Sequence, residues 1–426
     1  MLQLIVQHSP TLRAFLYGLH LHLSKPQWLH VLRLADALVV SEARHKTIAG
    51  LSRLIVEAPD PSNGADTLRI RPWTAEDLRA PIRHFIMADL VAYAHQTHQW
   101  TLDVSLDDSL DEKDKGTRHL EAVAYHHDHT KSQGPKKPYY TNGAVHVEVR
   151  LALGTRSYAY DWRLYLREKT VRRLNRHRTP EQRLRFRKKT MLAQEMLAAL
   201  QQLLPPGFQV YGLFDSWYAS NRLLRFCRRQ GWQVVCAIKS NRKLDDQKLS
   251  QWPQALRHQR YQRIQLTATD QRQRTYLVRT LQGKLNTLPF AVCVLISQRH
   301  HRDKHPKYFL CTDLSLSAQQ ILRLYQKRWP IEVDNFYVKQ HLGLADFRVQ
   351  SYEATEKWFA IVFLTLVFLQ WRFHQAHAKE HWQSLGDVVR HHRYEHARAL
   401  LETACQEAAK VRDYLPVLER FLCQPT

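Results

Sequence analysis

Hydrophobic positions recur at helical spacing through the first part of the chain. Three segments carry this pattern, and a Pro- and Gly-containing loop, PDPSNGAD (59–66), separates the second from the third. The pattern predicts a helical N-terminal region. The three segments are WLHVLRLADALVV (28–40), HKTIAGLSRLIVEA (45–58) and WTAEDLRAPIRHFIMADLVAYAHQ (73–96).

The period then changes to the alternation that is typical of strands. QWTLDVSLDDS (99–109) predicts a strand that ends in carboxylates, and 144–154 with 158–166 predicts a β-hairpin around Thr155 and Arg156. A loop is expected between them, at 130–143. Further along, strands and helices alternate, which indicates a mixed α/β core. The expected elements are a helix at 191–204, a strand at 208–216, a helix at 219–231 and a strand at 232–241.

From about 242 to 315 the pattern is β-rich and irregular, and helical periodicity returns at SAQQILRLYQKRW (317–329). We therefore expect a β-rich insertion placed inside the α/β core. The apolar run WFAIVFLTLVFL (358–369) is shorter than the ~20 residues that cross a bilayer, so we interpret it as a buried helix and expect no membrane partner. The predicted divisions are a helical N-terminal DNA-binding domain (1–97), a first core segment (98–241), the insertion (242–315), a second core segment (316–372) and a helical C-terminal tail (373–426).

The charge of the chain points to a polyanionic partner. Its 63 Lys and Arg against 39 Asp and Glu give a formal net charge of +24. A surplus of this size favours nucleic acid, because each neutralised phosphate releases condensed counterions. The six cysteines form no C-x-x-C pair, which excludes a recognisable disulfide framework or zinc ribbon and fits a reducing cytoplasm.

One short segment combines a tyrosine, two cations and a carboxylate. In YQKRWPIEVDNFYVK, Tyr325, Arg328, Glu332 and Lys339 fall within about 60° of one another on an α-helix. Pro330 either kinks this helix or begins a new one just before Glu332.

The spacing Y-x2-R-x3-E-x6-K resembles the YREK signature of the DDE transposases of insertion sequence family four, a bacterial cut-and-paste group. The resemblance covers roughly residues 100–372. It implies a ribonuclease H-like mixed sheet core, with the β-rich insertion before the last catalytic carboxylate and helical regions on either side.

The resemblance also implies two upstream aspartates at strand ends. YGLFDSWYAS supplies Asp215, and LDDSLDEK supplies Asp108, which precedes a hydroxyl residue as in the family. Asp107 stays an alternative, because strand alternation lets only one of the pair face the site. In this reading Asp108, Asp215 and Glu332 hold two Mg²⁺ ions, for which Mn²⁺ can substitute, with Asp108 bridging both.

The implied partners are double-stranded DNA, as transposon ends and target, and a second copy of the chain in a homodimer on paired ends. The implied DNA contacts are Tyr325, Arg328 and Lys339 of the signature, Tyr308 as a stacking surface for a flipped base, and Lys239, Arg242 and Lys243 at a basic strand end. The expected location is the bacterial cytoplasm, with the nucleoid as the site of DNA binding. Two other activities stay open: a domesticated DNA-binding protein, and a metal-dependent nuclease without strand transfer.

Two further segments have open interpretations. HKTIAGLSRL resembles the first helix of a helix-turn-helix that reads terminal repeats, although a helical packing domain fits nearly as well. The Arg- and Lys-rich segment 170–189 favours contact with the DNA backbone over a solvated helix face.

Overall fold

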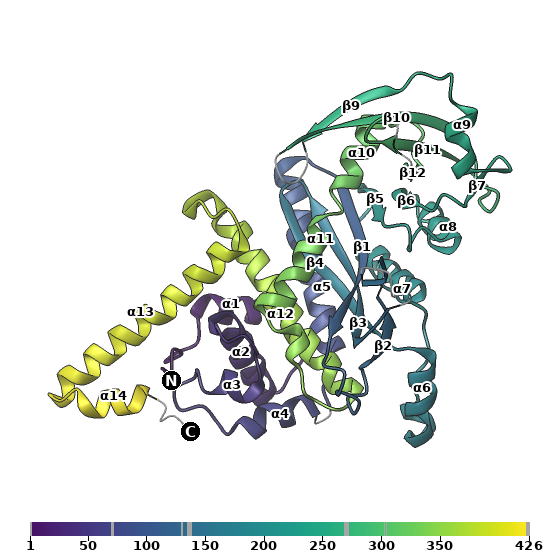
Figure 1. Ribbon diagram of the computed structural model, residues 1–426. Helices are drawn as coiled ribbons and strands as arrows, with labels where there is room; N and C mark the ends of the chain where they lie inside the picture. The colour runs from purple at the N-terminus through teal and green to yellow at the C-terminus, as the bar shows by residue number, and fades with distance from the viewer. Residues whose placement is uncertain are drawn as a thin grey trace.

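The fold is mixed α/β, built on one large sheet with helices at both ends of the chain (Figure 1). The computed structural model describes residues 2–69, 72–128, 131–133, 139–267, 272–301, 303 and 305–422, with the backbone alone for 376–380.

The sheet has ten strands, in the order β2-β3-β1-β5-β6-β12-β11-β10-β9, and β4 pairs with β3 beside β2. Strands β1, β5 and β6 are parallel, whereas β3 is antiparallel to both β1 and β4. This arrangement is consistent with the ribonuclease H-like transposase core that the sequence predicts. The strands of this core are β1 (Thr101–Glu112), β2 (Ala124–His127), β3 (Tyr140–Leu153), β4 (Arg156–Tyr165), β5 (Gln209–Phe214) and β6 (Gln233–Ile238).

The β-rich segment 242–315 extends this sheet, because β12 pairs with β6 in antiparallel register and β11, β10 and β9 follow outward. Figure 1 shows these strands curving over the end of the core. The elements of the segment are β7 (Lys243–Leu244), β8 (Gln247–Lys248), α9 (Trp252–Ala255), β9 (Gln262–Thr267), β10 (Gln273–Lys284), β11 (Ala291–Gln298) and β12 (Lys307–Cys311).

One face of the core sheet is polar although it is buried. In β3 the sequence alternates Val and polar residues, and His146, Glu148 and Arg150 point to the side opposite to the valines. Such a face is usually solvated. Here the chain covers it with α11 (Pro330–Phe336) and α12 (Tyr352–Glu380), so that these three polar side chains are at most 8% exposed.

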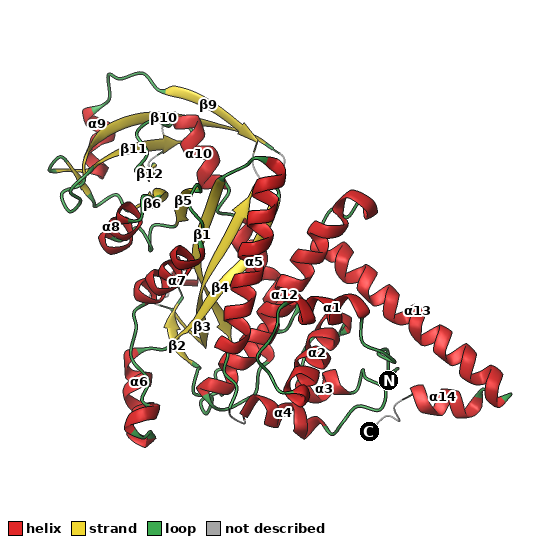
Figure 2. Ribbon diagram, turned by 180° about the vertical axis from the view of Figure 1, so that it is seen from behind, coloured by secondary structure: helices red, strands yellow, loops and turns green. Residues whose placement is uncertain are grey.

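The N-terminal helices pack on α12 and on α13 (Leu385–Val411), and α5 runs beside the edge strand β4 (Figure 2). The predicted loop at 59–66 is wrong from its third residue onward: α4 begins at Pro61, a residue suited to a first helical turn, and the Asp60 carboxylate accepts the Ser62 N–H. The N-terminal helices are α1 (Pro10–Gly18), α2 (Lys25–Val40), α3 (Ile48–Ser52), α4 (Pro61–Arg69) and α5 (Glu76–Thr97).

The remaining helices flank the sheet or end the chain. They are α6 (Glu168–Leu174), α7 (Lys189–Leu203), α8 (Asn221–Arg229), α10 (Ala318–Gln326) and α14 (Leu415–Phe421). Within the described residues, the stretch Tyr352–Gln375 of α12 is long and apolar enough to cross a membrane by length and composition alone. Because 89% of its apolar window is buried in the fold, it behaves as the core helix that the sequence predicts.

Candidate functional site

Two carboxylates lie in the middle of β1, and a third follows the neighbouring strand. β1 was expected to end near Ser109, but it continues to Glu112 because residues 109–112 still pair with β3. In the parallel pair of β1 and β5, Leu106 is opposite Phe214. Asp215, the first residue after β5, therefore lies beside Asp107, the alternative to Asp108 as the first ligand.

Asp107 and Asp108 point to opposite faces of the sheet, because side chains alternate along a strand. The Arg328 guanidinium donates to Asp107 at 2.7 Å (Nη1 to Oδ2). On the other face, Asp108 accepts from the Tyr218 hydroxyl at 2.9 Å and from Lys189 Nζ at 2.6 Å. Asp107 thus lies on the face of the sheet that carries the signature segment.

The charges of these aspartates repel one another. Burial, reinforced by the negative charges of Asp215 and Asp108 and opposed by Arg328, raises the pKa of Asp107 to about 6. Burial also raises the pKa of Asp215, against two hydrogen bonds from the backbone N–H groups of Trp217 (2.9 Å) and Tyr218 (3.0 Å). A bound cation would relieve both effects, because it favours the ionised carboxylates.

The signature segment is two helices rather than one. α10 ends at Gln326, a tighter turn carries Arg328, and Pro330 begins α11, so Glu332 lies in the first turn of the new helix. Past α11 the chain makes a π-helical turn at Tyr337–His341 that contains Lys339. Pro330 therefore begins a new helix just before Glu332 and does not kink a continuous one.

Arg328 joins two of the predicted site carboxylates. Its Nη1 contacts Asp107, and its Nη2 donates to Glu332 Oε1 at 2.6 Å. These two anions raise the pKa of Arg328 further above its ordinary value, although burial acts in the opposite sense. A single guanidinium therefore bridges carboxylates from β1 and α11.

A cleft of about 880 Å³ opens at this edge of the sheet. Its lining includes the candidate-site aspartates Asp107, Asp108 and Asp215, together with four lysines, Lys131, Lys189, Lys239 and Lys339. Trp217 also lines the cleft and is 47% exposed, with the ammonium groups of Lys189 and Lys239 at 5.9 and 5.5 Å from its ring centre. A cleft lined by both carboxylates and lysines suits a phosphate backbone held beside bound cations.

The other predicted DNA contacts differ in how accessible they are. Lys339 lines the cleft and donates to the Leu110 carbonyl at 2.7 Å, whereas Lys243 is exposed at the start of β7. Arg242 binds the Ala219 carbonyl (2.9 Å) and the Asn221 side chain (2.7 Å), so it already braces the start of α8.

The two predicted aromatic contacts are less accessible than the lysines. Tyr325 packs edge-on against Phe309, with ring centres 4.7 Å apart. Tyr308 is 6% exposed in β12, opposite Ile238. This conformation therefore offers no open ring face of Tyr308 to a flipped base, and its stacking role stays a prediction.

The sequence reasoning missed Trp217, Tyr218 and the role of Lys189. The signal for the first two was their place directly after Asp215, where the chain turns toward α8. The basic segment before α7 is partly used within the protein, because some of its cations form ion pairs with carboxylates. These cations are Arg172, Arg178, Arg187 and Lys189.

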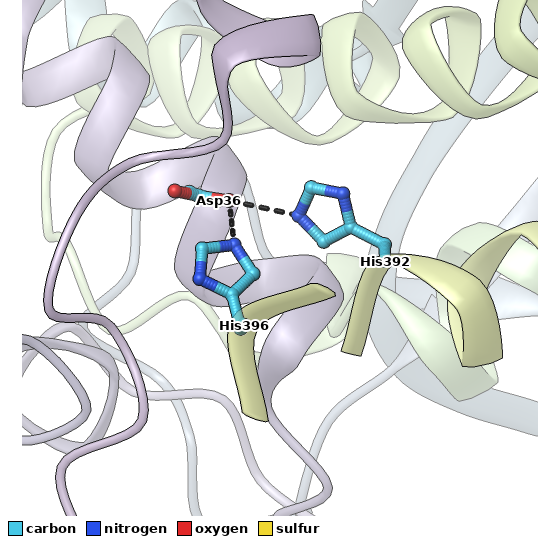
Figure 3. Close-up of side chains that lie close together, drawn as sticks. All are labelled: Asp36, His392 and His396. Atoms are coloured by element: carbon cyan, nitrogen blue, oxygen red, sulfur yellow. Dashed lines mark hydrogen bonds and ion pairs between the residues drawn. The ribbon is translucent and has the colours of Figure 1, made fainter. Parts of the chain in front are cut away.

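A second buried cluster lies far from the cleft. Asp36 of α2 accepts from the Nε2 atoms of His392 and His396 of α13, at 2.8 and 2.9 Å (Figure 3), and its other oxygen contacts His8 at 2.9 Å. The donor types would suit a transition metal, but these are direct hydrogen-bond distances. A metal on Nε2 of His392 would put a proton on its buried Nδ1, which has no acceptor among the described residues. The cluster is therefore a hydrogen-bonded connection between the two ends of the chain.

Comparison with known proteins gives one family match. Residues 188–368, less than half of the chain, match the family model of the transposase DDE domain. The matched stretch includes Asp215 and Glu332, and β1 with Asp107 and Asp108 precedes it. No curated protein matches the chain. The fold and the family match together support a DDE transposase, a class of enzyme that acts in DNA transposition.

Proposed function

We propose that this protein is a cut-and-paste DNA transposase that binds terminal inverted repeats, cleaves DNA with two metal ions and joins the 3′-hydroxyl ends to target DNA. The observation that carries the proposal is the convergence of carboxylates from β1, β5 and α11 beside a lysine-lined cleft. The match to the transposase DDE domain over the segment with Asp215 and Glu332 supports it.

The donor set suits Mg²⁺, which prefers hard oxygen ligands and retains several waters. The raised pKa values of Asp107 and Asp215 fit a site that is adapted to a cation. When bound, a metal pair activates the attacking water or 3′-hydroxyl and stabilises charge at the attacked phosphate. Mn²⁺ has similar ligand preferences and should substitute.

The first carboxylate of the proposed triad is Asp108, with Asp107 as the alternative. Asp108 has the family's sequence context, but Asp107 shares Arg328 with Glu332. Replacing each by asparagine separates them, because only loss of a metal ligand abolishes Mg²⁺-dependent cleavage. Cleavage lost in Asp107→Asn and retained in Asp108→Asn would move the assignment to Asp107.

The protein's cations have a positioning role in this proposal. Lys239 and Lys339 line the cleft and are proposed to hold phosphates near the carboxylates, and such contacts fix register without reading sequence. Arg328 is a third proposed phosphate contact, beside the cleft: with a metal bound to Asp107 and Glu332, its guanidinium would be free to bind a phosphate. Tyr325, Tyr308, Arg242 and Lys243 are proposed as outlying DNA contacts.

The finer assignments rest on the YREK spacing. They are membership of insertion sequence family four, a homodimer on paired transposon ends, and action in the bacterial cytoplasm. A metal-dependent nuclease without strand transfer is the second candidate, because the same carboxylates would serve hydrolysis alone.

The deciding experiment follows a labelled DNA that carries the candidate element's two ends, with unlabelled plasmid as target. Wild type should cut the ends and join them to the plasmid in Mg²⁺, whereas Glu332→Gln should bind the DNA and leave it intact. Cutting without joining would favour the nuclease. Equal activity of the two proteins would reject the carboxylate assignment.

A further inference from the structure

The helix that carries Glu332 is too short to set its own position. α11 has seven residues, and helices of this length depend on tertiary packing, because nucleation is costly. Its outer residues, Val333 and Phe336, are 41% and 53% exposed and give it little burial. Its position must therefore come from its inner face.

That inner face is mainly polar. Ile331, Asp334 and Asn335 are buried, at the i, i+3 and i+4 spacing of one helix side. Two of these three residues cannot anchor the helix by apolar packing. Both instead reach polar partners on the buried face of the sheet.

Asp334 is held from two directions. Arg150 of β3 donates through Nε to its Oδ2 at 2.7 Å, and Gln370 of α12 donates to its Oδ1 at 2.9 Å. Arg150 is itself fixed by a bond to the Ser157 hydroxyl, and Gln370 accepts the Ala159 N–H at 2.9 Å. The carboxylate thus ties α11 to β3, β4 and α12 at once.

Asn335 makes the second attachment. Its side-chain oxygen lies 3.0 Å from Nε2 of His146, and Nδ1 of His146 lies 2.9 Å from Asp111. His146 and Arg150 are four residues apart on β3 and point to the same face, so the two attachments hold α11 along the strand direction.

Strand β3 is also the strand that pairs with the part of β1 that contains Asp107 and Asp108. Glu148, between His146 and Arg150 on that face, is opposite Asp107. Besides the Arg328 bridge, contacts between β3 and α11 therefore help to set the distance from Asp107 to Glu332.

We propose that Arg150, with Asp334 and Gln370, and His146, with Asn335, are positioning residues that hold Glu332 at its place relative to the β1 aspartates. They act through α11 and touch neither metal nor DNA. The inference rests on the proposed function, because it assigns a role toward the metal site.

The test measures Mn²⁺ affinity of the full-length chain bound to labelled end DNA, by electron paramagnetic resonance of free Mn²⁺. The main variant, Arg150→Met with Asp334→Leu, removes both charges together, so that neither is left buried alone. Its Mn²⁺ dissociation constant should rise about tenfold or more, as for other residues that orient metal ligands. DNA affinity should stay close to that of wild type, and raised Mn²⁺ should recover part of the cleavage.

The matched control removes a different partly buried pair, Arg372 with Glu395, which joins α12 to α13 at 2.8 Å. Arg372→Met with Glu395→Gln should lower stability without changing Mn²⁺ affinity. Gln370→Met is a milder variant that loses only the bonds to Asp334 and Ala159, and its Mn²⁺ affinity should fall by a smaller factor.

The outcomes distinguish a failure of the proposed function from a failure of the positioning role. If wild type binds no Mn²⁺ and cuts no DNA, the proposed function fails. If wild type does both, and the folded Arg150/Asp334 variant binds Mn²⁺ as wild type does, the positioning role is refuted and the network only stabilises the fold. Should the double variant not fold, unchanged Mn²⁺ affinity in Gln370→Met gives the same refutation.

Discussion

Glu148 offers a sharp test of how the polar face of the sheet is stabilised. Its side chain is fully buried, and neither carboxyl oxygen has a hydrogen-bond partner among the described residues. Burial raises its pKa well above the ordinary value, and the charges of Asp334, Asp107 and Asp111 add to this effect, whereas Arg150 opposes it. The folded protein should therefore hold Glu148 as a neutral acid at pH 7.

The magnitude follows from two contributions. An unpartnered buried polar group costs about 1–3 kcal/mol, and methionine fills a similar volume without polar atoms. Glu148→Met should therefore raise the free energy of unfolding by about 1–3 kcal/mol at pH 7.5. Proton linkage adds to this gain, because the unfolded chain releases this proton near pH 4.3 and the folded wild type keeps it.

The sign of the pH effect distinguishes the contributions. Above about pH 4.3 the unfolded wild type binds fewer protons than the folded form, so stability falls as the pH rises toward the folded pKa. Glu148→Gln removes the proton and keeps the polar shape. It should gain stability at pH 7.5 and almost none at pH 4, whereas Glu148→Met should gain at both.

Denaturant titrations at the two pH values measure these differences, provided that the slopes match those of wild type. A Glu148→Met protein less stable than wild type at pH 7.5 would refute a neutral Glu148 in the folded protein. That result would mean that Glu148 is ionised and paired with Arg150, since removing one partner of a buried ion pair is strongly destabilising.

Three other predictions follow from the site and the Asp36 cluster. Trp217→Ala should weaken binding to DNA with unpaired ends by about 1–3 kcal/mol, whereas Trp217→Phe should keep most of the wild-type affinity. Equal affinities of the two variants in fluorescence anisotropy would count against a stacking role. Burial lowers the pKa of His392, so stability should fall as the pH drops below about 6.5, where the unfolded chain takes up the proton. The melting temperature should therefore change less between pH 8 and pH 5 in His392→Gln than in wild type, and an equal change in the two proteins would contradict the linkage. Arg328→Gln should lower the melting temperature of the metal-free protein, because Asp107 loses its cationic partner. Added Mn²⁺ should raise the melting temperature more in Arg328→Gln than in wild type, and no difference between the proteins would exclude Arg328 as the group that offsets the charge of Asp107.

Local patterns predicted most elements of the fold, and their limits have physical causes. The alternation in β3 and the turn at Thr155 were readable because a hairpin depends on near neighbours. The end of β1 was placed too early because Asp111 looks like a loop residue, yet it is buried against His146 across the sheet. The helix at Pro61 was missed because turn-forming residues also begin helices.

Residue types and spacing suggested the candidate site, whereas its contacts join residues far apart in the sequence. Asp215 and Glu332 stood out by order and spacing. The choice between Asp107 and Asp108 depends on which sheet face meets Arg328, a contact across more than two hundred residues. The link from Asp36 to His392 spans a still longer separation, and no local pattern reports it.

The Asp36 cluster also sets an order of events during synthesis. α2 is made early, but two of the three imidazoles that satisfy its buried carboxylate belong to α13, near the end of the chain. Until those residues leave the ribosome, Asp36 has only His8 and the N–H of Ser9, and the N-terminal helices lack the helix that closes over them. A chain interrupted before α13 would thus contain all the candidate site carboxylates, while its N-terminal helices would still lack the partners that complete their folding.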